Sequence, residues 1–254
     1  MKTTLPLQRL RPLAVPALLL AALEAYARTA GAGSDALAPP SAALAAWGRA
    51  FTDRSLFEAT AFTLAGAVLG LAIGAGLGLA AGMVLGLAPR AARACSPAIE
   101  LLRPLPSVAL IPLAMMIFGF GLWLEACIVA VATFWPLTVL AQAAVRQVEP
   151  QWLEVAQVLG LSPWARASQI VLPAIVPRLF TALRLGAGIA LVVAVTVEIA
   201  ANPHGLGYAM SLAQQSLDPA LMLAWLGWIG VLGYAVYAGL LHAERALRAR
   251  MGVA

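Results

Sequence analysis

Charged residues are scarce in this sequence. Asp, Glu, Lys and Arg make up 11% of its 254 residues, whereas 62% are hydrophobic. Soluble globular proteins carry about 25% charged residues, and a chain with less than half that share cannot cover itself with a polar surface. A soluble globular fold is therefore excluded, and the lipid bilayer is the solvent that this composition requires.

Cysteine and histidine are nearly absent as well. Cys95 and Cys127 are the only cysteines, and their spacing fits neither a disulfide framework nor a zinc site. The sequence has two histidines, His204 and His242, and no glycine-rich phosphate-binding loop. The net charge of +5 is modest and scattered, which argues against nucleic acid as a partner. We expect a non-catalytic chain that binds no metal and no cofactor of its own.

Long apolar runs are what the sequence has in excess. A membrane-spanning helix needs about 20 mainly apolar residues. Six such segments are expected, over 12–30, 60–87, 106–120, 123–144, 181–201 and 220–241. The predicted fold class is an all-α, polytopic membrane protein with about six transmembrane helices. The first segment follows basic residues, so a cleaved signal peptide is the alternative interpretation there.

Basic residues predict the orientation, because they accumulate in cytoplasmic loops. With the N-terminus inside, the cytoplasmic side receives Lys2, Arg9, Arg11, Arg90, Arg93, Arg103, Arg146, Arg166, Arg178, Arg184, Arg245, Arg248 and Arg250, and the outer side receives Arg28, Arg49 and Arg54. We therefore expect a multi-pass protein of the bacterial cytoplasmic (inner) membrane with both termini in the cytoplasm.

Glycine recurs at every fourth position of the second apolar segment. The row consists of Gly66, Gly70, Gly74, Gly78, Gly82 and Gly86. Small residues at this spacing let two membrane helices approach each other closely. We expect the row to pack inside the bundle and to take no part in substrate binding.

The loop between the fourth and fifth segments is far longer than a simple connection. Its apolar positions follow steps of four, three and four, which mark one face of a helix: Val148, Trp152, Val155 and Leu159. Gly160 suits the left-handed residue that ends a helix, and Ser162-Pro163 would begin a second one, which Pro173 and Pro177 would end before the membrane. Such an amphipathic helix either lies on lipid headgroups or docks into a groove of a partner.

The residues of this loop favour docking. Glu154-Val155-Ala156, Gly160 and Ile170-Val171-Leu172-Pro173 resemble the Glu-Ala-Ala (EAA) loop of ATP-binding-cassette importer permeases, in which three residues precede the Gly and nine precede the Ile. Val155 is the one departure, since the family has alanine there. The resemblance implies the following ATPase-coupling residues: Gln151, Trp152, Glu154, Val155, Ala156, Leu159, Gly160, Ile170, Leu172 and Pro173.

Other segments are similar to the nitrate, sulfonate and taurine permease subfamily: Leu102-Arg103-Pro104-Leu105-Pro106, Phe118-Gly119-Phe120-Gly121 and Gly205-Leu206-Gly207-Tyr208. The resemblance implies a MetI-like type I importer fold. Residues 1–58 would then be a transmembrane helix with a periplasmic linker, and residues 59–254 a permease core with its cytoplasmic coupling loop over 146–178.

The same resemblance implies partners and a cargo. The partners would be a second permease subunit, expected to be an identical copy, two ATPase subunits that hold ATP and Mg²⁺, and a periplasmic or lipid-anchored solute-binding protein. The cargo would be a small oxyanion such as nitrate, an alkanesulfonate or taurine.

Glu198 lies near the outer end of an otherwise apolar segment, and intramembrane ionisable residues are functional candidates. A pathway or gate role and a structural hydrogen bond both remain open for it. The turn after it would begin a short helix that closes the outer mouth. The pathway or gate candidates are Glu198, His204, Gly205, Gly207 and Tyr208.

The alternative function is an ATP-independent secondary transporter or channel. Such proteins use intramembrane ionisable residues or paired broken helices, often in repeats. Glu24 and Glu198 are the two ionisable residues that we assign to the apolar segments, and we expect Glu24 to pair with Arg28 within one helix. The sequence shows no internal repeat, which disfavours this alternative.

Overall fold

The computed structural model of the chain describes residues 7–29, 37–52 and 54–250, which contain helices and no strand. The helices are α1 (Leu7–Arg28), α2 (Pro40–Thr52), α3 (Ser55–Leu87), α4 (Pro89–Leu102), α5 (Ile111–Phe118), α6 (Leu122–Arg146), α7 (Pro150–Val158), α8 (Pro163–Arg166), α9 (Leu172–Ala200), α10 (Gly205–Gln215) and α11 (Pro219–Arg250), with a 3₁₀ turn, η1 (Ser107–Leu110), and a π-helical turn, η2 (Ala167–Val171). The all-α fold class is confirmed.

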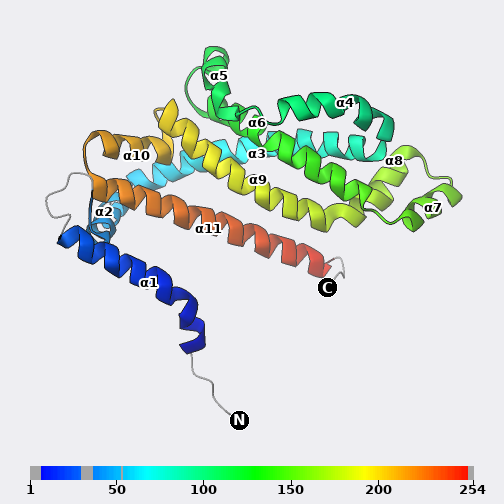
Figure 1. The fold of residues 1–254 in the computed structure, drawn as a ribbon. Coiled ribbons are helices and arrows are strands. Elements are labelled where there is room, and N and C mark those ends of the chain that lie inside the picture. Colours follow the sequence, from blue (N-terminus) through cyan, green and yellow to red (C-terminus); the bar gives the residue numbers. More distant parts are fainter. Residues whose placement is uncertain (1–6, 30–36, 53, 251–254) are drawn as a thin grey trace, which may run out of the picture.

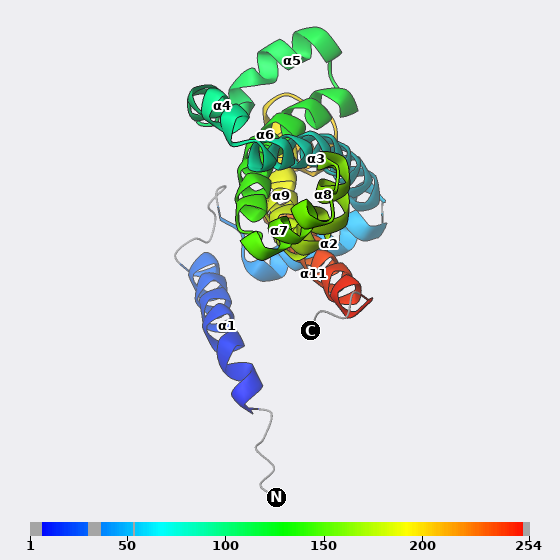
Figure 2. The ribbon, with the colours of Figure 1, turned by 90° about the vertical axis from the view of Figure 1, so that its right-hand side faces the viewer.

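Four long helices, α3, α6, α9 and α11, run side by side and form the body of the molecule (Figure 1). The short helices α7 and α8 lie at one end of this bundle, which we name the loop end, and α2 and α10 lie at the opposite end. The view in Figure 2 shows α1 standing away from the bundle, with its main helix contact to α2.

Among the described residues, four single helices are long and apolar enough to cross a membrane: α3, α6, the α8–α9 unit and α11. Helices α4 and η1–α5 form a fifth candidate as a broken span, bent by 79°. The predicted segment 12–30 corresponds to α1, which is not among these candidates, so the described residues give four or five spans where about six were expected. A polytopic membrane protein is therefore confirmed.

The third predicted segment, 106–120, is too short to cross the membrane alone and forms the second half of this bent pair. Helix α5 has 8 residues and is about 12 Å long, which is less than half of the hydrocarbon thickness. Gly119 and Gly121 end it with φ of 70° and 116°, and Pro104 and Pro106 interrupt the chain before η1. The sequence interpretation missed α4, whose polar and apolar positions alternate with a helical period, so that it contains no long apolar run.

The glycine row of α3 packs against α6, as predicted. A Cβ atom built on Gly70 would lie 2.5 Å from Val129 Cβ and 2.7 Å from the carbonyl oxygen of Ala126. The other five glycines of the row likewise face α6 atoms at distances that no side chain tolerates without a shift. Such close backbone contact gives van der Waals packing where lipid supplies no hydrophobic driving force between helices.

The prediction that Pro173 and Pro177 end the second loop helix is wrong, because α8, η2 and α9 form one unit from Pro163 to Ala200. The π-helical turn η2 shifts the hydrogen-bond register, and Pro173 then falls in the first turn of α9, where no amide hydrogen is required. The chain therefore passes without a break from the loop into the membrane span.

The link between α1 and α2 is a small polar cluster. Arg28 Nε donates to Glu24 Oε1 one helical turn earlier, which confirms the predicted pair. The backbone amide of Ser41, in the first turn of α2, also donates to Glu24 Oε2 at 3.0 Å. Glu24 therefore fixes the corner between two helices.

Candidate functional site

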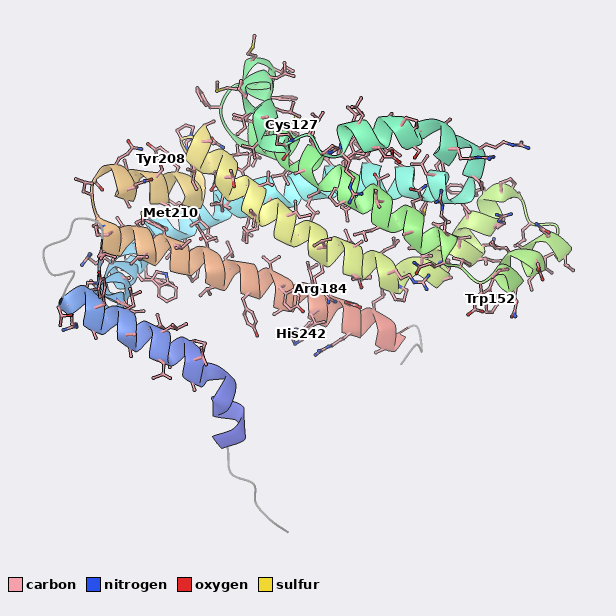
Figure 3. All side chains as sticks on the ribbon, in the orientation of Figure 1. Cys127, Trp152, Arg184, Tyr208, Met210 and His242 are labelled. Atoms are coloured by element: carbon pink, nitrogen blue, oxygen red, sulfur yellow. The ribbon has the colours of Figure 1, made fainter. Side chains whose placement is uncertain are left out.

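The first candidate region is the loop end, where α7 presents apolar side chains to the surroundings. Trp152 is 54% exposed, Leu159 65% and Val158 88%, and Val155 is also exposed. These side chains lie at the far tip of the molecule, as the position of Trp152 shows in Figure 3. A helix that keeps its apolar face uncovered in this way has the form of a docking element.

The end of α7 is built as predicted. Gly160 adopts φ of 62°, Leu161 N donates to Ala156 O at 3.0 Å, and Gly160 N donates to Gln157 O at 3.0 Å. These two hydrogen bonds together form the Schellman motif, which favours glycine at the left-handed position. Ser162 then caps α8, since its hydroxyl accepts a hydrogen bond from Ala165 N at 3.2 Å. The turn between α7 and α8 is therefore a defined structure.

The predicted coupling residues divide into two groups in space. Those exposed on the outside of the loop are Gln151, Trp152, Glu154, Val155, Leu159 and Gly160. Ala156 is buried, Ile170 and Leu172 are half-buried, and Pro173 is exposed where α9 begins. Leu172 packs on the apolar cluster between α6 and α9 that contains Val148 and Ile175. The second group therefore ties the loop to the bundle.

Sequence reasoning missed two exposed side chains of this region. Val158 and Trp164 are among the most exposed large apolar residues of the described chain, at 88% and 79%. Both stand in the two spacers of the Glu-Ala-Ala pattern, where any residue is allowed, so the motif did not mark them. The sequence marks them in one way only: they are bulky apolar residues in a loop between two membrane spans.

The second candidate region is a buried polar cluster at the opposite end of the bundle. Glu198 is 1% exposed. Its Oε1 accepts a hydrogen bond from Thr63 Oγ1 at 2.6 Å, and its Oε2 accepts one from the backbone amide of Gly207 at 2.8 Å. Thr63 Oγ1 in turn accepts one from Leu206 N at 3.0 Å. One carboxylate therefore holds α3, α9 and the first turn of α10 together.

Glu125 in α6 belongs to this cluster, and sequence reasoning missed it. It lies inside the predicted span 123–144 and is fully buried. Asn202 Nδ2 donates to Glu125 Oε2 at 3.3 Å and to the carbonyl oxygen of Gly121 at 3.2 Å. The assignment of Glu24 and Glu198 as the two ionisable residues of the apolar segments is therefore corrected to include Glu125.

Glycine is required at two positions of α10, where its first turn lies directly against the end of α9. A Cβ on Gly205, which has φ of 89°, would overlap the Glu198 carboxylate, and a Cβ on Gly207 would lie 2.8 Å from Glu198 Cβ. The predicted short helix after the turn is present as α10. His204 precedes it with its ring 5.1 Å from that of Phe62, whereas Tyr208 points outward and is half-exposed (Figure 3). Glu198, Gly205 and Gly207 are thus brought together, and Tyr208 is not.

Helix α9 connects the two candidate regions. Its 29 residues, Leu172–Ala200, span roughly 44 Å, from the loop to the polar cluster that contains Glu198. Near its start, Arg178 Nη1 donates to the carbonyl oxygen of Ala144 in α6 at 3.3 Å. Further along, Arg184 forms an ion pair with Glu244 of α11. A displacement of the loop would therefore be transmitted along one continuous helix.

Comparisons with known proteins agree on one family. Residues 72–243 match the family model described as "Binding-protein-dependent transport system inner membrane component". The taurine transport system permease protein TauC of Escherichia coli is 30% identical over 197 residues, covering 78% of this chain and 72% of that protein. The riboflavin transport system permease protein RibX of Chloroflexus aurantiacus is 32% identical over 260 residues, covering 95% of this chain and 97% of the relative.

The fold is also similar to solved structures. A chain of the MetNI methionine ABC transporter, in an inward-facing conformation, superposes with a TM-score of 0.69. It is 19% identical in sequence, and the match covers 77% of this chain and 97% of that chain. At this identity the likeness concerns the fold, and it agrees with the predicted MetI-like architecture.

Proposed function

Because this chain belongs to the family of binding-protein-dependent transport system inner membrane components, we propose that it forms the translocation pathway of an ATP-binding-cassette importer and is driven by a separate ATPase through α7. It is a permease subunit of such an importer and a non-catalytic membrane component. The coupling residues, the orientation, the copy number and the cargo are parts of the proposal.

The observation that carries the coupling proposal is the uncovered apolar face of α7. Trp152, Val155 and Leu159 lie on it at the loop end, and the polar Gln151 and Glu154 flank it. A hydrophobic contact with a polar rim is the usual composition of a protein–protein interface. The matching spacing of the Glu-Ala-Ala pattern supports an ATPase as the partner in that interface.

The proposed mechanism uses the continuity of α8, η2 and α9. Closure of an ATPase pair on ATP and Mg²⁺ would pull α7, and α9 would carry this movement to the polar cluster at the opposite end. Glu198, His204, Gly205, Gly207 and Tyr208 would form or support the outer gate there. The permease then needs two packings of similar free energy, each favoured by a different ligand.

The proposed assembly follows the same logic. The loop end faces the cytoplasm, both chain termini lie there, and the opposite end meets a periplasmic or lipid-anchored solute-binding protein. A second, identical permease subunit completes the pathway. Two ATPase subunits complete the complex.

The proposed cargo is a small oxyanion, with a sulfonate such as taurine as the first candidate and nitrate as a further one. The relative TauC is named for taurine transport, whereas RibX is named for riboflavin transport, so the test includes both. The binding protein that delivers the cargo is expected to set most of the selectivity.

Reconstitution tests the function. The permease, its ATPase and its binding protein are placed in proteoliposomes, and uptake of labelled taurine, an alkanesulfonate, nitrate and riboflavin is measured with and without ATP. The proposal expects uptake that requires ATP and the ATPase. Uptake by the permease alone along an ion gradient would instead support a secondary transporter, and passive equilibration would support a channel.

A further inference from the structure

Three arginines surround a polar cavity between α4 and α6. The cavity has a volume of about 330 Å³. Arg93 and Arg103 line it from α4 and its C-terminal cap, and Arg146 lines it from the last turn of α6. Among the described residues, these guanidinium groups form no ion pair. The cavity therefore has an unused capacity for anions.

The single acidic residue of the lining does not cancel this charge. Glu100 accepts a hydrogen bond from the hydroxyl of Ser96 at 3.1 Å, and Gln142 adds a neutral amide. Three arginines against one glutamate leave two net positive charges around the cavity. Planar guanidinium groups that face one space are suited to the several oxygens of a phosphate.

An apolar cavity of about 470 Å³ adjoins the polar one. Its lining comes from α3, α4 and α6 and includes Val84, Ala98, Phe134 and Trp135, while Ile99 lines both cavities. On α6, the apolar lining lies one to three turns farther from the loop end than Gln142 and Arg146. On α6 the polar part is thus nearer the loop end, whereas on α4 the two linings overlap between Cys95 and Ile99 and lie side by side.

We propose that the two cavities together bind an anionic phospholipid, with its phosphate between Arg93, Arg103 and Arg146 and one acyl chain in the apolar cavity. A free soluble anion would use the polar cavity alone, whereas the joined pair matches a headgroup and a tail. Basic pockets between spans on the cytoplasmic side are known lipid headgroup sites. The inference rests on the proposed function only for the cytoplasmic orientation of the loop end.

The bound lipid would stabilise the broken span. Helix α4 has its main helix contact with α3, and the two cavities separate it from α6. A lipid that bridges Arg93 and Arg146 would close this separation and fix α4 against the helix that leads into the coupling loop. We therefore expect lipid binding to raise the melting temperature of the complex.

Native mass spectrometry of the purified permease–ATPase complex tests the headgroup part. Dioleoyl phosphatidylglycerol should bind about 10-fold or more tightly than dioleoyl phosphatidylcholine. The variant Arg93→Gln/Arg146→Gln should lose this preference. The control Arg90→Gln/Arg245→Gln removes the same charge from exposed arginines outside the cavity and should keep it. An unchanged preference in the first variant, or an equal loss in the control, overturns the proposal.

A second arm tests the acyl chain. Ala98→Trp would fill the apolar cavity and should weaken dioleoyl phosphatidylglycerol at least several-fold, while the affinity for glycerol phosphate stays the same. If glycerol phosphate or taurine displaces the lipid at equal concentration and Ala98→Trp has no effect, the site holds a soluble anion and the lipid proposal fails. Because binding is measured without transport, its failure is distinguishable from failure of the proposed function, which the uptake assay reports.

Discussion

The carboxylate of Glu198, in α9, accepts a 2.8 Å hydrogen bond from the backbone amide of Gly207, in the first turn of α10. The amides of a first helical turn have no partner within their own helix, and a carboxylate placed there also meets the positive end of the helix dipole. A buried acidic residue thus serves as the cap of the short helix at the outer end. This contact makes the position of α10 depend on the position of α9.

Replacing Glu198 should loosen this end of the molecule. Glu198→Ala leaves the buried Gly207 amide without its acceptor, at a cost of about 1–3 kcal/mol. It also removes the bond between α9 and Thr63, whose hydroxyl keeps Ala59 O as an acceptor within α3. The melting temperature in detergent should fall by several degrees. The control Glu58→Ala changes an exposed glutamate of α3 and should leave it unchanged. Equal melting of both variants would show that the cluster does not hold α10.

The packing of α3 predicts that alanine at two of its glycines, Gly70 and Gly76, changes stability in different ways. Gly70→Ala would force α3 and α6 apart, because Val129 and Ala126 occupy the space of the new methyl group, and overpacking of this kind costs about 1–3 kcal/mol. Gly76→Ala meets no atom within 4 Å and improves helix propensity, so it should be neutral or stabilising. Thermal unfolding of the two variants measures the difference, and similar melting would refute close packing at Gly70.

Two variants of the coupling loop should separate folding from ATPase binding. Glu154→Lys reverses a charge on an exposed side chain, and Gly160→Pro forbids the φ of 62° that the turn after α7 needs. Both should insert into the membrane normally and lose association with the ATPase on co-purification. Glu58→Lys, at the opposite end, should retain it. Normal ATP-dependent uptake by either loop variant would count against docking.

The ion pair between Arg184 and Glu244 should behave as a coupled unit. Each of Arg184→Met and Glu244→Met leaves a buried charge, which is expected to cost about 3–5 kcal/mol, whereas the double variant replaces both charges by apolar atoms and should recover most of the loss. A double-mutant cycle of unfolding free energies measures this coupling. Strictly additive single effects would mean that the pair does not join α9 to α11.

The parts of the fold that follow a local rule could be predicted from the sequence. The apolar runs predicted α3, α6, α9 and α11, and the four-residue glycine spacing predicted close packing of α3 inside the bundle, though not its partner α6. Gly160 and Ser162 predicted the turn of the loop. Each of these signals is contained in a few consecutive residues. That is why the loop was assigned without knowledge of the remaining chain.

The parts that depend on contacts between distant residues could not be predicted. Glu125 accepts a hydrogen bond from Asn202, which lies 77 residues away in the turn between α9 and α10. Whether Pro173 ends a helix depends on the π-helical turn before it. Whether the third span is one helix or two depends on how α4 lies against α3. Hydropathy alone does not distinguish a straight span from a bent pair of helices, because both can contain a similar number of apolar residues.

Site-directed cross-linking at Val158 shows whether α7 docks on the ATPase. In a background with Cys95→Ser and Cys127→Ser, Val158→Cys is placed on the exposed face of α7, and Leu77→Cys on the exposed surface of α3 serves as the control. We predict that Val158→Cys cross-links to the ATPase in a transport-competent complex and that Leu77→Cys does not. A complex that imports its cargo while Val158→Cys reaches only lipid would contradict it.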